Sequence, residues 1–281
     1  MTTDQTSAPV LFDRSLLLQR QRRAARAPET FLRDRIIEDL GDRLAAVKRT
    51  IRDAADVWTP GGLQAPFTHR FASFAHVPES VREELALAPQ SLDLALSVLA
   101  LQFVNDLPGL LAQIRRALRP DGLLLAAMIG GDTLTELRQS FAAAEAECEG
   151  GVSPRVAPSA DLRDVGGLLQ RAGFALPVTD VDRVVVRYAN AFGLMQDLRR
   201  MGATNVLVER RRTPTRRTTM LRMAEIYAER FADPDGRIRA TFDIIWLSGW
   251  APHESQQKPL RPGSARASLE DAVKRIPKTE T

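Results

Sequence analysis

The chain has 281 residues, which is enough for one large domain with a substantial core. Of its 39 basic residues 35 are arginines, and 35 acidic residues nearly balance them, leaving a net charge of +4. With 44% hydrophobic and 26% charged residues, the composition excludes wholesale disorder. The small charge excess disfavours a dedicated nucleic-acid binder.

Cysteine and histidine usage limits the covalent and metal chemistry. The one cysteine, Cys148, excludes an internal disulfide and a cysteine-based zinc site. The three histidines, His69, His76 and His253, are far apart in the sequence. No apolar run reaches the roughly 18 residues of a membrane-spanning helix, and the amino-terminal residues carry no apolar secretory core. We therefore expect a protein of the bacterial cytoplasm without a bound structural metal.

The first half of the chain alternates helical and strand-like segments. Residues 29–48 place apolar side chains such as Leu32 and Ile36 at helical spacing. Residues 91–98 and 123–129 are short apolar runs, which are typical of strands buried on both faces of a parallel sheet. We also predict helices over 12–26 and 107–118, strands over 54–58 and 67–74, and a turn at 119–122.

The second half begins with a glycine pair and changes character near residue 178. Asp132 or Thr133 can cap a helix that reaches about residue 148. Residues 178–188 alternate valines with charged residues, which predicts an antiparallel strand with one wetter face. Further helices are predicted over 159–172, 192–201 and 216–231, and a final strand over 241–250.

This order predicts an α/β protein with a mostly parallel, Rossmann-like sheet, helices on both faces and an antiparallel C-terminal strand pair. We divide the chain into an N-terminal helical segment (1–50), a main domain (51–257) and a polar tail (258–281) that we expect to be mobile. In such sheets ligands bind beyond the carboxyl ends of the strands. We therefore expect one crevice there, formed by the residues that follow the strands.

Several motifs carry a family resemblance. The most specific is Gly130-Gly131-Asp132-Thr133-Leu134, and Gly249-Trp250 with His253-Glu254-Ser255-Gln256 closes the match. Further matches are Phe12-Asp13-Arg14, Val104-Asn105-Asp106-Leu107-Pro108 and Leu118-Arg119-Pro120-Asp121-Gly122. The chain resembles the class I S-adenosylmethionine (SAM) methyltransferases. In detail it resembles the complex I assembly proteins of mitochondria and related bacteria, which are similar to the biotin-pathway malonyl-carrier-protein methyltransferase.

The resemblance implies a SAM-dependent enzyme that methylates or hydroxylates an arginine of a complex I iron–sulfur subunit. It also implies a protein substrate and a peripheral contact with an anionic membrane, at the inner face of the inner membrane. The implied catalytic residues are Asp132, Thr133, His253 and Glu254. The implied cofactor-binding residues are Asp56, Gly61, Gly62, Ser97, Gln102, Asn105 and Asp106, and no metal ligands are implied.

The cofactor loop departs from the family pattern. That pattern is Asp-x-Gly-x-Gly-x-Gly, but Trp58 and Pro60 stand where the first two glycines belong. Asp56 and Asp93 are 37 positions apart, about one helix–strand unit too few, so the cofactor half is expected to be truncated. The predicted strand 67–74 contains no acid to hold the cofactor ribose, and Glu79, Glu83 and Glu84 lie in a predicted solvated helix. These departures predict weak or lost SAM binding.

Alternatives remain at several positions. Asp132 with Thr133, and Asn105 with Asp106, can line the crevice or cap helices. The arginine cluster 210–212 with 216–217 can be a solvated face or can hold RNA or an anionic surface. Three functions therefore stay open: a SAM-dependent enzyme of complex I assembly, a catalytically degenerate assembly chaperone, and, least favoured, an RNA-binding protein.

Overall fold

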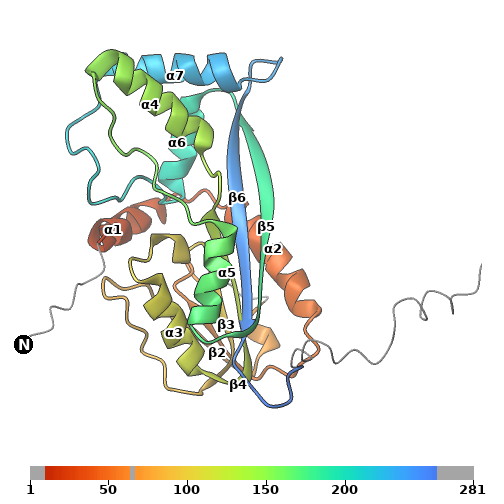
Figure 1. Cartoon of the computed structure of the whole chain (residues 1–281). Helices are drawn as coiled ribbons and strands as arrows, with labels where there is room; N and C mark the ends of the chain where they lie inside the picture. Colours follow the sequence, from red (N-terminus) through yellow and green to blue (C-terminus); the bar gives the residue numbers. More distant parts are fainter. Residues whose placement is uncertain (1–9, 64–66, 258–281) are drawn as a thin grey trace, which may run out of the picture.

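A six-stranded sheet of order β2-β1-β3-β4-β6-β5 forms the centre of the computed structural model, which describes residues 10–63 and 67–257 (Figure 1). Strands β1 to β4 pair in parallel, and β6 runs antiparallel to both β4 and β5. The predicted mostly parallel sheet with an antiparallel C-terminal pair is therefore confirmed. The strands are β1 (Asp53–Val57), β2 (Ser73–Val77), β3 (Leu92–Val98), β4 (Leu118–Gly130), β5 (Ala175–Tyr188) and β6 (Ile238–Trp250).

Helices cover both faces of the sheet because the central strands are apolar on both sides. Leu94 and Leu96 of β3 belong to one buried cluster, and Ala95 between them belongs to the other. The first cluster includes side chains of α2 (Phe31–Ala45), α4 (Thr135–Glu149), α6 (Ala191–Arg200) and α7 (Arg217–Phe231). The second includes side chains of α3 (Leu107–Ala117) and α5 (Leu162–Arg171). Figure 1 shows α4, α6 and α7 gathered beside the upper parts of β5 and β6, and α1 (Arg14–Ala24) contacts α6.

Two predicted elements are shifted in the structure. The strand predicted over 67–74 is wrong, because residues 68–70 form a 3₁₀ turn and β2 begins at Ser73. The turn predicted at 119–122 is also wrong, because β4 already begins at Leu118. Asp121 adopts a φ of 65°, and the pairing of β3 with β4 shifts register there, so the Pro-Asp-Gly sequence makes an irregularity within a strand rather than ending one.

The segment between β1 and β3 lacks elements that two helix–strand units would supply, as the 37-position spacing of Asp56 and Asp93 predicted. Its described residues contribute one strand, β2, and no α-helix, so the sheet ends at β2 on this side. The predicted helix around Glu79 to Glu84 is wrong, since residues 78–90 are irregular. No helix within the described ranges has the length and apolar character needed to cross a bilayer. The predicted mobile tail lies outside the described residues.

Candidate functional site

A groove of about 1780 Å³ opens at the carboxyl ends of β1, β3 and β4. The loop after β1, residues 99 and 101–104 after β3, and residues 128–129 and 133–134 around the end of β4 line it. On its other side it is bounded by α1 and by the chain that follows α6. Ligand pockets for one small molecule typically have volumes of roughly 300–1,000 Å³. This groove therefore has room for a cofactor and for part of a larger substrate.

The loop after β1 keeps left-handed backbone positions despite its unusual side chains. Trp58 adopts a φ of 64°, a conformation that normally favours glycine, and its indole is 1% exposed within the apolar cluster under α3 and α5. Gly61 lines the groove with a φ of 77°, and a Cβ there would lie 2.9 Å from a guanidinium nitrogen of Arg33. Thr59 accepts a hydrogen bond from the Val98 amide at 3.0 Å, which ties the loop to β3. Trp58 therefore adopts the left-handed backbone conformation for which the family pattern has a glycine.

Asp56 and His76 form a pair across β1 and β2. The two residues are register partners, and Nδ1 of His76 lies 2.9 Å from Oδ2 of Asp56. Burial raises the pKa of Asp56, and hydrogen bonds from Thr59, Leu63 and His76 only partly oppose that effect. Asp56 itself lies beneath the groove, while His76 is 44% exposed and lines it. A Cβ on Gly62 would lie 3.4 Å from Nδ1 of this imidazole, and Gly62 does not line the groove.

The sequence analysis missed a buried ion pair at the edge of the groove. Glu79 follows β2 by two residues, and its carboxylate lies 2.7 Å from the Arg14 guanidinium of α1. Both side chains are nearly fully buried, at 6% and 4% exposure. Arg14 also lies 4.8 Å above the Trp58 ring and donates to the carbonyls of Ser80 and Phe103. The available sequence signal was Pro78-Glu79, directly after β2. The predicted strand began six residues too early, so Glu79 fell in a predicted helix.

The glycine-pair motif forms a tight turn locked onto β6. A Cβ on Gly131, whose φ is 54°, would lie 2.5 Å from the Asp243 carboxylate. That carboxylate accepts from the Asp132 amide and from Arg183, and these bonds hold its pKa below the usual range although burial alone would raise it. Thr133 donates to the Gly130 carbonyl and accepts from the Asp243 amide.

These contacts decide whether Asp132 and Thr133 line the groove or cap α4. The prediction that Asp132 or Thr133 caps α4 is wrong, because Leu134 precedes the helix in a left-handed conformation without a side-chain cap. Thr133 lines the groove, whereas the Asp132 carboxylate turns to Arg183 at 2.7 Å and does not line it. A catalytic role for either residue stays a prediction.

The other cofactor-side predictions separate into different environments. Asp106 caps α3, accepting from the Gly109 amide at 2.9 Å. Asn105 accepts from the amides of residues 11 and 12 and so fastens the chain before α1. Ser97 is fully buried within β3. Gln102 alone of these four lines the groove, where its amide donates to the Leu99 carbonyl.

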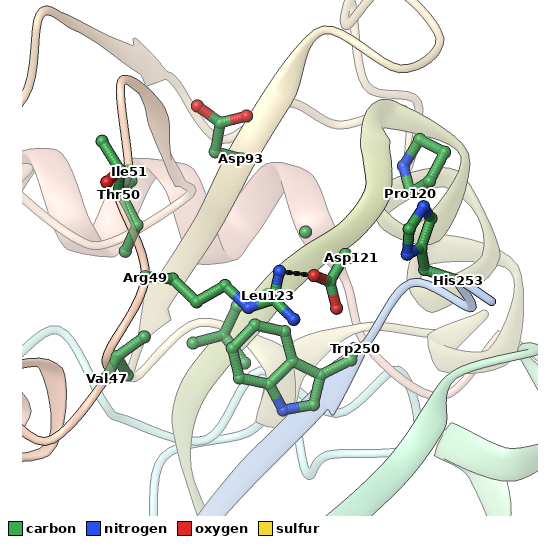
Figure 2. Close-up of a pocket in the computed structure, with 11 residues that line it drawn as sticks. Val47, Arg49, Thr50, Ile51, Asp93, Pro120, Asp121, Leu123, Trp250 and His253 are labelled. Carbon is green, nitrogen blue, oxygen red and sulfur yellow. Dashed lines mark ion pairs between the residues drawn. The ribbon is translucent and has the colours of Figure 1, made fainter. Parts of the chain in front are cut away.

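His253 and Glu254 do not lie near the groove. Trp250 at the end of β6 pairs with Leu123, and Asp243 pairs with Gly130 at the end of β4. Because β6 runs antiparallel, residues after Trp250 emerge at the amino ends of the parallel strands. Figure 2 shows His253 there, lining a small cavity of about 280 Å³ beside an Arg49–Asp121 ion pair. His253 and Glu254 are therefore separated from Asp132 and Thr133, with which the resemblance groups them as catalytic residues.

Two of the five arginines in the cluster 210–212 with 216–217 are paired with acids. Arg210 lies 3.2 Å from Asp13, and Arg211 pairs with Glu149. The remaining members, residues 212, 216 and 217, are exposed. Within the described ranges, no group of three or more His, Cys, Asp or Glu side chains is placed to hold a metal ion.

Comparison with known proteins gives the family. A methyltransferase-domain model matches residues 68–126. The chain is 37% identical over 284 residues to the human arginine-hydroxylase NDUFAF5, mitochondrial, and the match covers 92% of this chain and 82% of the human protein. The chain belongs to the NDUFAF5 family. The predicted resemblance is therefore confirmed.

Other relatives of this NDUFAF5-family chain carry two different named activities. The Dictyostelium discoideum arginine-hydroxylase NDUFAF5 is 47% identical over 178 residues, which cover 63% of this chain but only 41% of that protein. A malonyl-[acyl-carrier protein] O-methyltransferase of Laribacter hongkongensis is 39% identical, covering 68% of this chain and 62% of the enzyme. Among solved structures, a Bacillus halodurans protein assigned as a methyltransferase gives a TM-score of 0.49 at 15% identity, covering 75% and 96% of the two chains.

The methyltransferase domain and the family support SAM as the cofactor of this NDUFAF5-family chain, and the groove can be tested for its fit. Its volume is sufficient, Gly61 brings backbone into it, and Glu79 supplies a carboxylate directly after β2. An acid at that position can hold ribose hydroxyls. The volume of the groove and its backbone at Gly61 fit the cofactor, and Glu79 can serve the ribose only where its ion pair with Arg14 leaves a carboxylate oxygen open to the groove.

Proposed function

We propose that this protein is a SAM-dependent enzyme that modifies an arginine side chain of a protein subunit during respiratory complex I assembly. The observation that carries the proposal is the groove at the carboxyl ends of β1, β3 and β4, in a chain whose relatives are arginine hydroxylases. Its volume of about 1780 Å³ exceeds what a cofactor needs and leaves space for a substrate side chain with adjoining backbone. An iron–sulfur subunit of complex I is the substrate that the family resemblance favours.

Different residues of this chain can bind the cofactor and act on the substrate. Gly61 and Glu79 are the residues that would hold SAM, which supplies an activated methyl group when bound. His76 is placed to move a proton, because Asp56 engages its Nδ1 and leaves Nε2 for the groove. A buried carboxylate behind an imidazole orients the ring and stabilises its protonated form. Proton removal matters for methyl transfer because the nitrogen electron pairs of a guanidinium cation are delocalised over the whole group and are poor nucleophiles.

A non-catalytic role in assembly is the second candidate. The ion pair of Arg14 with Glu79 favours it, since a neutralised and buried acid is not free to bind ribose. In this version the groove still engages the complex I subunit, but no cofactor is consumed. SAM affinity separates the two candidates.

The test combines cofactor binding with the state of complex I in the natural host. Calorimetry should show SAM binding to the purified full-length protein. Deletion of the gene should lower assembled complex I, and mass spectrometry of its subunits should show loss of one methyl group from a single arginine, or of one oxygen where the reaction is a hydroxylation that draws its oxygen from an oxidising co-substrate other than SAM. Unmodified subunits in wild-type cells would contradict the enzymatic proposal, and normal complex I in the deletion strain would contradict both candidates.

A further inference from the structure

Five exposed arginines form one wall of the groove. We call them the rim arginines: Arg22, Arg23 and Arg26 at and after the end of α1, and Arg199 and Arg200 at the end of α6. Helices α1 and α6 contact each other, so the two sets lie on one continuous surface. Within the described residues, no side-chain hydrogen bond or ion pair occupies any of these five guanidinium groups.

The rim arginines differ in this respect from the other arginines that line the groove. Arg155, Arg210 and Arg211 are paired with acids, and Arg20 and Arg33 donate to backbone carbonyls. Burial, and then the charges of Arg210 and Arg23, lower the pKa of Arg20, as expected in a crowded cationic region.

Nearby negative charge does not balance the rim. The only acids among the described groove residues are Glu29 and Glu79, and Glu79 is already paired with Arg14. The carbonyl ends of α1 and α6 each contribute about half a negative charge. Together with Glu29 they offset about two of the five positive charges. The wall therefore keeps a positive excess that faces the groove.

We infer that the groove binds an acidic segment of the protein substrate, with Asp or Glu side chains of the substrate against the rim arginines. This inference rests on the proposed function and names its substrate class. The acidic segment lies along α1 and α6, and the modified residue reaches toward His76 and Gly61 at the carboxyl ends of the strands. Cationic walls of this kind select partners and accelerate encounter by charge complementarity.

Shape and side-chain chemistry favour a peptide over other polyanions. The rim arginines border a concave groove, whereas a membrane surface is flat. RNA recognition commonly uses exposed aromatic rings on which bases stack. Five described Phe and Trp rings line this groove: those of Trp58, Phe12, Phe141 and Phe242 are each less than 7% exposed, and that of Phe103 is half-buried and packs edge-on against Phe12. These rings are packed into the protein and are not free to stack on bases.

The experiment measures binding of a defined peptide to the full-length protein. The probe is a fluorescein-labelled peptide in which one arginine is flanked by glutamates, and its counterpart carries glutamines instead. We expect the glutamate peptide to bind more tightly and to lose affinity as salt rises, because exposed charge pairs are screened. The triple variant Arg22→Glu/Arg23→Glu/Arg26→Glu should bind it at least about tenfold more weakly, and Arg199→Glu/Arg200→Glu should act in the same direction.

A matched control uses exposed arginines on the other side of the sheet. The triple variant Arg116→Glu/Arg163→Glu/Arg171→Glu changes the net charge equally on α3 and α5 and should leave peptide affinity within about twofold. Urea unfolding of all variants shows that they are folded. Equal binding of the two peptides, or equal weakening by the control, would overturn the inference.

Two further probes identify a wrong partner class. Rim-dependent binding of single-stranded RNA or of phosphatidylserine vesicles, without binding of the acidic peptide, would overturn the inference in favour of that partner. Failure of this inference is distinguishable from failure of the proposed function. A protein that binds SAM and restores complex I, but ignores the charge of the peptide, keeps its function and loses only this substrate class.

Discussion

Replacing Arg14 with alanine should destabilise the protein by about 3–5 kcal/mol at neutral pH, because it leaves a buried carboxylate without its partner. Glu79 is 6% exposed and lies 2.7 Å from the Arg14 guanidinium. The same substitution removes donors to the carbonyls of Ser80 and Phe103, at 3.0 and 3.2 Å, and the contact with the Trp58 ring. A loss of this size is a large part of the roughly 5–15 kcal/mol that stabilises a typical domain.

The destabilisation should depend on pH in a defined direction. Burial raises the pKa of Glu79, and Arg14 lowers it in part. A carboxyl group whose pKa is higher in the folded than in the unfolded state adds stability at low pH, and this stability is lost as the pH rises through the folded value. Without Arg14 the folded pKa rises further. The deficit of Arg14→Ala should therefore be smaller at about pH 5 than at about pH 7.5.

Urea unfolding at the two pH values measures both effects. Glu79→Gln in the Arg14→Ala background removes the more buried of the two carboxylates beside Arg14, the other being Glu83 at 3.7 Å, so the double variant should recover about 1–3 kcal/mol at the higher pH and lose most of the pH dependence of the deficit. Changes elsewhere in the titration cancel because every comparison is made at one pH. An Arg14→Ala protein that unfolds within about 0.5 kcal/mol of wild type, or a double variant no more stable than the single, would refute the reasoning.

Three further substitutions test the site. Gly131→Ala should cost about 2–3 kcal/mol in urea unfolding, since its Cβ would lie 2.5 Å from the Asp243 carboxylate at a φ of 54°; unchanged stability would contradict the locked turn. His253→Ala should leave the unfolding free energy within about 0.5 kcal/mol of wild type, because the side chain is exposed and far from the groove. The variant should also rescue complex I assembly in a deletion strain. Failure to rescue would favour a catalytic role for His253 after all. His76→Gln should slow arginine modification by about 10²-fold or more while SAM affinity by calorimetry stays near wild type; unchanged modification would exclude proton transfer by His76.

The sequence by itself determined most of the local structure. Apolar periodicity located the helices and the buried strands, because side chains on one helix face or one strand repeat at fixed intervals. Asp106 and Asp161 cap α3 and α5 through contacts within three residues, which is information that a short window contains. The distance from Asp56 to Asp93 also showed that the cofactor half is short, since a strand and its crossover need a minimum length.

Tertiary structure alone decided which of the chemically capable residues meet. His253 lies away from the groove because β6 reverses direction, and strand direction depends on pairing between residues more than 100 positions apart, as for Gly130 and Asp243. Arg14 and Glu79 are brought together from α1 and the end of β2, where neither local pattern signals the other. The rim arginines form one wall only because α1 and α6 pack side by side. The distances between these polar residues are set by how the apolar faces of the helices and strands pack. The hydrophobic effect that drives this packing is non-directional, so a single sequence does not reveal which polar residues meet.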